Sequence, residues 1–302
     1  MGWDARVNSA VRPKAKMDTL SEFIEMAIEK VSRLPLNSSC VDAIPFHSLT
    51  RRQDKVYKIG YDATVLFAQY ECGGGICISP KGTILTCSHT LGNKPKRGIE
   101  KVIVFTNGKV VLTRAIEVDV KKDLALLSII AEYDNTQKRF YPVKKTPKYP
   151  FVDISNEIKA KERVVCYGQP GVDDLEADAD DGDVKTGYPV IARSSGKIEK
   201  LNFNETEFTH SAWTYWGHSG SALLNQDCKV VGIHVGWESD EEIRLAVHLN
   251  TIQSFLKSID DDDKEEDDSE TEHDQDTGKK RKRDTDKVEV LHQRKRYLGK
   301  RK

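Results

Sequence analysis

The chain has 302 residues, of which 38% are hydrophobic and 31% are charged, and its 47 Lys and Arg nearly balance its 48 Asp and Glu. This length allows one large domain with extensions or two small domains, and it can bury a sizeable core. A transmembrane helix is excluded, because the longest uncharged apolar run, Leu124 to Ala131, falls far short of the roughly 18 residues needed to cross a bilayer. Composition also excludes collagen-like, coiled-coil and wholly disordered chains.

Residues 1–40 are predicted to form an N-terminal extension with one helix. Thr19 to Glu22 has the pattern of a capping box, and Pro35 ends the helix. Between them, apolar side chains recur at helical spacing: Leu20, Phe23, Ile24, Ala27, Ile28 and Val31. We expect this helix to pack on the body of the protein, and a partner-binding helix is the alternative.

Residues 41–258 are predicted to form the folded domain, and their pattern is that of β-strands. The β-rich runs are 63–68, 75–78, 83–86, 101–105, 109–118, 124–130, 163–167, 190–193, 221–224 and 229–235. Gly, Asn, Asp and Pro separate these runs, and no long helical pattern lies between them. The pattern therefore favours an all-β fold of antiparallel sheets or barrels. A last helix is predicted over 250–258, and the acidic segment 172–183 is predicted to be a mobile surface loop.

Residues 259–302 are predicted to form a disordered charged tail. The acidic block 260–268 cannot bury itself, and the basic clusters 279–283, 294–296 and 300–302 follow it. Clusters of this kind serve as nuclear-import signals or bind polyanions, so we expect residues 279–302 to bind a nuclear-import receptor. Nucleic acid is the less favoured partner, because the acidic block competes with phosphates for the same basic residues.

The six cysteines show no dense spacing of the kind that marks a disulfide scaffold. The first residues, Met1 to Arg6, contain no apolar stretch that could act as a secretory signal. We therefore expect reduced thiols and an intracellular, nuclear location. No Cys/His pair has a strong zinc-ligand spacing, so neither a metal nor another cofactor is expected.

Three motifs carry candidate chemistry, in the order His, Asp, Ser. His89 ends a predicted hairpin that begins with three glycines, and Asp123 directly precedes a buried apolar run. Ser219 lies in a turn between Gly217 and Gly220 that leads into a strand. A serine hydroxyl is a weak nucleophile until an imidazole takes its proton, and the imidazole needs a carboxylate on its other nitrogen. The N–H groups of Gly217 and Ser219 would then bind the developing oxyanion.

These motifs resemble the trypsin/chymotrypsin-like superfamily and are most similar to its HtrA-like (DegP-like) branch. The resemblance covers roughly residues 58–257 and rests on the segments ISPKGTILT, DLALL, ERVVCYGQP, GHSGSALLNQDCKVVGI and RLAVHLNTIQSFL. It implies two antiparallel six-stranded β-barrels with the active site between them. It also implies that His89 is the general base, Asp123 orients it and Ser219 is the nucleophile.

The sequence departs from this family pattern at several places. Ser88 precedes His89 where Ala is usual, and His218 precedes Ser219 where Asn or Asp is commoner. No cysteine directly follows His89, where secreted trypsins have one that forms a disulfide, and we expect no PDZ domain after residue 258.

Thr214 and His234 lie five residues before and fifteen residues after Ser219. In this fold these positions border the primary specificity pocket, and Gly236 lies on the same wall. The pair resembles the pocket of staphylococcal glutamyl endopeptidase and of picornaviral main proteases, which cleave after Glu and Gln. A hydroxyl and an imidazole N–H match a side-chain carbonyl or carboxylate, and buried donors reject an apolar side chain. A hydrogen-bonded core histidine is the alternative for His234.

The sequence thus predicts an intracellular serine endopeptidase that acts on polypeptides and prefers Glu or Gln before the scissile bond. The alternative is an inactive protease-fold protein that acts as a nuclear binding module through its charged tail.

Overall fold

The computed structural model describes residues 20–34, 41–42, 51–143, 148–171, 190–238 and 243–259. The chain divides into two units, residues 1–259 and 260–302, and every described element belongs to the first. The predicted loop 172–183 and the basic clusters of the tail lie outside the described residues.

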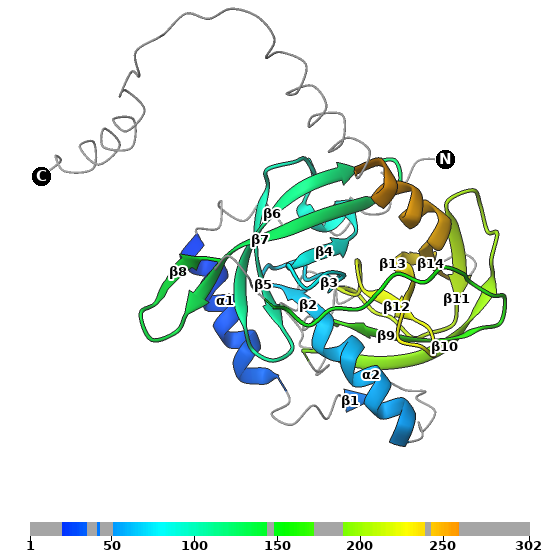
Figure 1. Cartoon of the computed structure of the whole chain (residues 1–302), viewed down its shortest axis with the longest axis horizontal. Coiled ribbons are helices and arrows are strands. Elements are labelled where there is room, and N and C mark those ends of the chain that lie inside the picture. Colours follow the sequence, from blue (N-terminus) through cyan, green and yellow to red (C-terminus); the bar gives the residue numbers. More distant parts are fainter. Residues whose placement is uncertain are drawn as a thin grey trace, which may run out of the picture. The chain divides into compact units, whose positions relative to one another are not determined.

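The first half of the folded unit is a closed antiparallel barrel (Figure 1). Its strands are β2 (Thr64–Phe67), β3 (Gly74–Cys77), β4 (Thr83–Thr86), β5 (Glu100–Phe105), β6 (Val110–Asp119) and β7 (Leu124–Asp134). They run in the order β4-β3-β2-β5-β6-β7, and pairing of β4 with β7 closes the barrel. A further strand, β8 (Arg139–Pro142), pairs with the far end of β7.

The second half is a second closed barrel. Its strands are β9 (Arg163–Gly168), β10 (Ala192–Lys200), β11 (Glu207–His210), β12 (Ala222–Leu224), β13 (Val230–Glu238) and β14 (Ile243–His248). They run in the order β10-β11-β14-β13-β12-β9, and pairing of β9 with β10 closes the barrel. The short β1 (Val41–Asp42) adds to β10 in parallel. The predicted all-β fold with two six-stranded antiparallel barrels is confirmed.

Helices lie at both ends of this unit. The predicted N-terminal helix is α1 (Leu20–Arg33), and the predicted C-terminal helix covers residues 249–259. A third helix, α2 (Arg51–Ala63), was not anticipated from the sequence. Among the described residues no helix is long and apolar enough to span a bilayer.

Gly60 explains why α2 escaped prediction. Tyr57, Gly60 and Tyr61 follow helical spacing and are buried, but a glycine inside a helix costs about 1 kcal/mol relative to alanine and so weakens the pattern. The structure shows why glycine is present: a Cβ here would lie 2.3 Å from Leu224 Cδ1 and 2.9 Å from Cys228 Sγ. Close approach of α2 to the second barrel outweighs helix propensity at this position.

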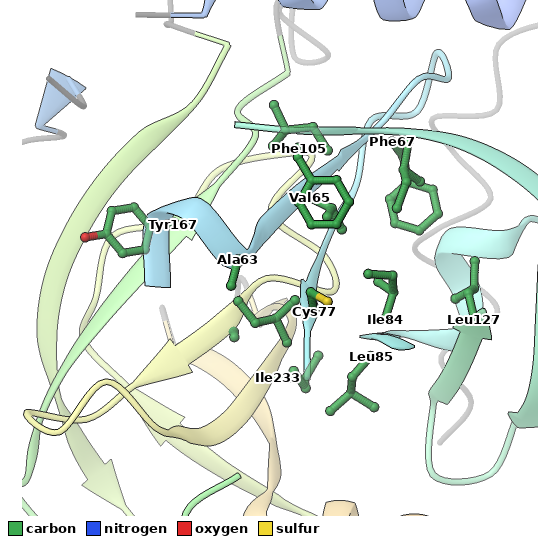
Figure 2. Close-up of a cluster of buried hydrophobic side chains, with 14 of the residues drawn as sticks. Ala63, Val65, Phe67, Cys77, Ile84, Leu85, Phe105, Leu127, Tyr167 and Ile233 are labelled. Carbon is green, nitrogen blue, oxygen red and sulfur yellow. The ribbon is translucent and has the colours of Figure 1, made fainter. Parts of the chain in front are cut away.

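One apolar core runs from the first barrel into the second (Figure 2). Val65, Phe67 and Ile84 fill the first barrel, whereas Tyr167 and Ile233 belong to strands of the second. Full burial of an apolar side chain of this size contributes roughly 1.5–3 kcal/mol. The continuous core therefore holds the two barrels in a fixed relation, and groups carried by different barrels can form one site.

Candidate active site

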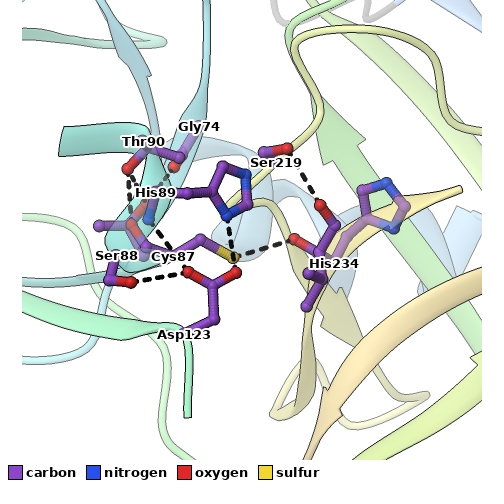
Figure 3. Close-up of polar contacts among 10 residues, drawn as sticks. Gly74, Cys87, Ser88, His89, Thr90, Asp123, Ser219 and His234 are labelled. Atoms are coloured by element: carbon purple, nitrogen blue, oxygen red, sulfur yellow. Dashed lines mark hydrogen bonds and ion pairs between the residues drawn. The ribbon is translucent and has the colours of Figure 1, made fainter. Parts of the chain in front are cut away.

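His89 and Asp123 form a hydrogen-bonded pair at one end of the first barrel (Figure 3). His89 lies in a short 3-10 helix, η3 (Ser88–Leu91), directly after β4, and Asp123 directly precedes β7. Because β4 and β7 pair with each other to close the barrel, the residues next to their ends, His89 and Asp123, come together. The distance from His89 Nδ1 to Asp123 Oδ2 is 2.6 Å, and the imidazole is partly exposed.

The second carboxylate oxygen of Asp123 is also occupied. Ser88 Oγ donates to Asp123 Oδ1 at 2.7 Å, and the backbone N–H of His89 donates to the same atom at 3.0 Å. Burial would raise the pKa of Asp123, but the hydrogen bonds and charge of His89 and the Ser88 hydroxyl hold this pKa below its usual value. The carboxylate is therefore ionised and fixed in orientation at neutral pH.

Ser219 comes from the second barrel, in the turn before β12, and in Figure 3 the His89 ring lies between Ser219 and Asp123. Two glycines shape this turn, with φ of 95° at Gly217 and 84° at Gly220. A Cβ at Gly220 would lie 2.2 Å from the carbonyl oxygen of Gly74, which belongs to the first barrel. The Gly74 N–H donates to the Ser219 carbonyl at 2.8 Å, so the turn is held against the first barrel.

The Ser219 hydroxyl donates to the carbonyl oxygen of Val235 at 3.1 Å rather than to His89. Catalytic hydrogen bonds are often loose without substrate, and rotation about one bond redirects this hydroxyl. Among the described residues, neither the Gly217 N–H nor the Ser219 N–H has a hydrogen-bond acceptor. Both N–H groups thus remain candidates for the oxyanion site that the sequence analysis expects.

The predicted specificity residues lie on the second barrel, close to this turn. His234 and Gly236 are both on β13, where a bulge between them shifts the register against β14. The His234 N–H donates to the Ser221 carbonyl, and the His234 carbonyl accepts from the Gly220 N–H. Thr214 is buried, and its hydroxyl has no hydrogen-bond partner among the described residues.

His234 is not alone in the interior. Its Nδ1 lies 3.1 Å from Nε2 of His210, and the ring of His218 meets it edge to face. Burial is the main cause that lowers the pKa of all three, to about 3 for His210, to about 4 for His218 and well below the usual value for His234. All three imidazoles are therefore neutral at physiological pH.

The arrangement of these groups agrees with the comparison to known families. Residues 73–233, which are more than half of the chain, match the trypsin-like peptidase domain. The chain belongs to the trypsin-like peptidase family. This match includes His89, Asp123 and Ser219, whereas α1 and the C-terminal helix lie outside it.

Relatives of this trypsin-like peptidase include HtrA and DegP-like proteins. "Serine protease HTRA1" of Xenopus laevis is 30% identical over 54% of this chain and 30% of that protein. A "probable periplasmic serine endoprotease DegP-like" of Rickettsia conorii is 25% identical over 82% of this chain and 41% of that protein. The chain thus spans about a third of the length of the curated relatives it matches. A serine endoprotease structure from Yersinia pestis has the same fold, with a TM-score of 0.51 at 19% identity over 70% of this chain and 67% of that one.

One group of described residues in this trypsin-like peptidase has the donor types of a metal site. Ligand atoms of Cys87, His89 and Asp123 lie within 4.8 Å of one another. However, burial raises the pKa of the Cys87 thiol well above its usual value, and its Sγ donates to the His234 carbonyl. A metal-binding cysteine must be a thiolate, and His89 already engages Asp123. The group is better suited to proton transfer than to metal binding.

Two residues of this trypsin-like peptidase that contact predicted site residues were not singled out from the sequence. Ser88 was noted only as a departure from the usual Ala, and the structure shows that its hydroxyl holds Asp123. His210 was given no role in the sequence analysis, yet it contacts the predicted specificity residue His234. The unusual Ser88 was a usable signal, but nothing in sequence spacing connects His210 with His234.

We expect Ser88→Ala to lower kcat of this trypsin-like peptidase about 10-fold and to leave KM nearly unchanged. The variant removes one charge-assisted hydrogen bond, worth roughly 1.5 kcal/mol, from the carboxylate that orients His89. Steady-state kinetics on a peptide substrate measures the effect, with Ser79→Ala on the β3–β4 turn as a matched control. Wild-type kcat in Ser88→Ala would contradict the role.

Proposed function

We propose that this chain is a serine endopeptidase that cuts polypeptides after Gln, and less readily after Glu, with His89, Asp123 and Ser219 as its catalytic triad. The observation that carries the proposal is the 2.6 Å hydrogen bond between His89 Nδ1 and Asp123 Oδ2, formed beside a glycine-flanked serine. Membership of the trypsin-like peptidase family supports the same reaction.

In the proposed mechanism His89 Nε2 takes the proton of Ser219 Oγ as this oxygen attacks the scissile carbonyl carbon. Asp123 holds the imidazole in the tautomer that leaves Nε2 unprotonated, and it stabilises the imidazolium that forms. His89 then gives the proton to the leaving amine, and an acyl-enzyme on Ser219 remains. Water, deprotonated by His89, attacks this ester and releases the new carboxyl terminus.

The N–H groups of Gly217 and Ser219 are the proposed oxyanion donors. During attack the carbonyl oxygen gains negative charge, and fixed backbone donors stabilise it without rearrangement. Both N–H groups lack an acceptor among the described residues, which supports this role. Each such donor typically contributes about 3 kcal/mol to stabilisation of the transition state.

The preference for Gln rests on the buried donors behind the serine. The Thr214 hydroxyl is buried without a partner, so a substrate carbonyl that accepts from it would remove a desolvation cost of about 1–3 kcal/mol. In the tautomer that we propose, His210 Nε2–H donates to His234 Nδ1, so that the neutral His234 carries its proton on Nε2 and donates to the same substrate side chain.

Neutrality of His234 favours Gln over Glu. A buried carboxylate beside uncharged donors keeps its desolvation cost, whereas the carboxamide of Gln brings no charge into the pocket. Because burial and its His neighbours hold the pKa of His234 well below the usual value, the preference should persist from pH 8 down to pH 6.

The decisive experiment is cleavage-site profiling on a proteome-derived peptide library, with Ser219→Ala as the inactive control. We expect cuts after Gln, fewer after Glu, and none in the control. His234→Ala should lower kcat/KM for a Gln peptide about 100-fold, because the substrate amide loses its partner. His248→Ala, which changes a histidine on the adjacent strand, is the matched control and should retain the wild-type preference.

The outcomes separate the two parts of the proposal. Ser219-dependent cuts after Arg, Leu or Ala would retain the peptidase and refute the pocket. The absence of Ser219-dependent cuts would refute the peptidase. Import of the protein into the nucleus through residues 279–302 stays a separate prediction, because these residues lie outside the described part of the chain.

A further inference from the structure

The helix α1 lies outside the matched peptidase domain and yet packs tightly on the first barrel. Ala27 is fully buried, and Phe23, Met26 and Val31 pack against the same core. The helix contacts β5, and Figure 1 shows it beside this strand. Packing alone accounts for these apolar residues, but not for a lysine on the same helix.

Lys30 is only partly exposed, and its ammonium group contacts Gln169, which is buried. Burial lowers the pKa of Lys30, and the charge of Cys72 partly offsets this effect. The Gln169 carboxamide has one orientation in which its nitrogen finds an acceptor and its oxygen finds a donor. In that orientation the oxygen accepts a hydrogen bond from Lys30 Nζ. Burying an ammonium without such a partner costs free energy. A lysine that only kept the helix soluble would extend into water, so the contact with Gln169 indicates another role.

The partners of Lys30 lead directly to the proposed oxyanion site. In the same orientation the Gln169 side-chain nitrogen donates to the Gly73 carbonyl at 3.0 Å. The next residue, Gly74, donates its N–H to the carbonyl of Ser219 at 2.8 Å. One continuous chain of bonds therefore runs from α1 to the backbone of the proposed nucleophile.

A second path reaches Gly217. A Cβ on Gly217 would lie 2.3 Å from the Gln169 carbonyl oxygen and 2.8 Å from Cys72 Cβ, so this glycine rests on both residues beside Lys30. Two residues further along, the Gly171 N–H donates to the Trp216 carbonyl at 2.5 Å. The segment 169–171 thus supports the turn that carries both proposed oxyanion donors.

We propose that Lys30 is a positioning residue for this peptidase: by holding Gln169, it makes docking of α1 a condition for a correctly shaped oxyanion site. The helix is then a built-in activating element rather than a passive extension. A binding partner that removed α1 from the barrel would switch the enzyme off without contacting its triad.

This inference rests on the proposed function, and its test is arranged to separate the two. Lys30→Met keeps the length and apolar stem of the side chain and removes the charge. Arg33→Met is the matched control, because Arg33 is on the same helix, is partly exposed and pairs only loosely with Glu29 at 3.8 Å. Both variants are made in the full chain, and their Tm values are compared with that of the wild type.

We expect Lys30→Met to lower kcat 10- to 100-fold, with KM unchanged and the affinity for a peptide boronate, a mimic of the tetrahedral intermediate, reduced by a similar factor. Binding of an uncleaved peptide, measured in a Ser219→Ala background, should be unaffected by Lys30→Met. Amide hydrogen exchange over residues 169–171 and 215–220 should become faster in Lys30→Met and not in Arg33→Met.

Wild-type kcat together with unchanged exchange over residues 215–220 in Lys30→Met would overturn the inference. An equal loss of kcat in Arg33→Met would also overturn it, because the effect would then belong to helix stability. If the wild type shows no Ser219-dependent hydrolysis but the exchange data follow Lys30, the proposed function fails and the positioning of the turn by Lys30 stands.

Discussion

Asp123→Asn is expected to lower kcat about 10⁴-fold while the protein stays folded. Oδ1 of Asp123 accepts two hydrogen bonds, from Ser88 Oγ and from the His89 N–H. In the variant these donors require the amide oxygen at this position, so the amide nitrogen faces His89 Nδ1. That nitrogen donates, and the imidazole must then carry its proton on Nε2, where it cannot accept the proton of Ser219.

The measurement is kcat for a peptide substrate, with circular dichroism as the test of folding. Asp119→Asn is the matched control, because among the described residues this nearby carboxylate accepts only from the backbone of Lys121 and Lys122 and the ammonium of Lys122. It should keep kcat within about twofold. Activity of Asp123→Asn close to the wild-type level would show that Asp123 does not orient His89.

Acid should unfold this protein at unusually mild pH. His210, His218 and His234 are buried and neutral, and burial keeps their folded-state pKa values at about 3, at about 4 and well below the ordinary value. In the unfolded chain a histidine binds its proton near pH ~6.5. At a pH between the folded-state and unfolded-state pKa values, the unfolded chain binds more protons than the folded protein. The free energy of unfolding therefore falls as the pH falls through the unfolded-state pKa.

Each such histidine contributes at most about 1.4 kcal/mol per pH unit, so all three together lower the free energy of unfolding by roughly 4 kcal/mol per unit near pH 5. Since domains are typically stable by about 5–15 kcal/mol, unfolding is expected within about one to four units below pH ~6.5. Urea unfolding at a series of pH values measures this slope. His218→Asn, which removes one titrating group, should reduce it by about a third, and a flat profile from pH 7 to pH 5 would refute the assignment.

Much of the fold follows from local pattern. The first-barrel strands β2 to β7 were placed within a few residues, because Gly, Asn and Pro mark their ends and their side chains are strongly apolar. The strands β8 and β11 were not anticipated. The first, Arg139–Pro142, is half exposed and carries a proline, and the second, Glu207–His210, has three polar residues and one large apolar residue. Their pairing depends on neighbours far away in the sequence.

In the candidate site too, contacts between residues far apart in the sequence could not be predicted. His89, Asp123 and Ser219 could be proposed because each lies in a short motif with its own chemical logic. The bonds of Lys30 to Gln169 and of His210 to His234 could not, since each joins residues that only the folded barrels bring together. Local sequence thus proposes the reacting groups, whereas tertiary structure reveals the groups that hold them.

The strand β13 carries both a proposed specificity residue and a backbone contact of Ser219. His234 is one of the proposed specificity residues, and the carbonyl oxygen of the next residue, Val235, accepts a hydrogen bond from the hydroxyl of Ser219. Hydrogen bonds from Gly220 to His234 and from His234 to Ser221 join this strand to the two residues that directly follow Ser219. In the proposed function, this hydrogen-bonded backbone fixes the position of the His234 imidazole relative to Ser219, so we expect the pocket to select side-chain length as well as polarity. Asn and Asp are one methylene shorter than Gln and Glu, and we therefore expect few cuts after them.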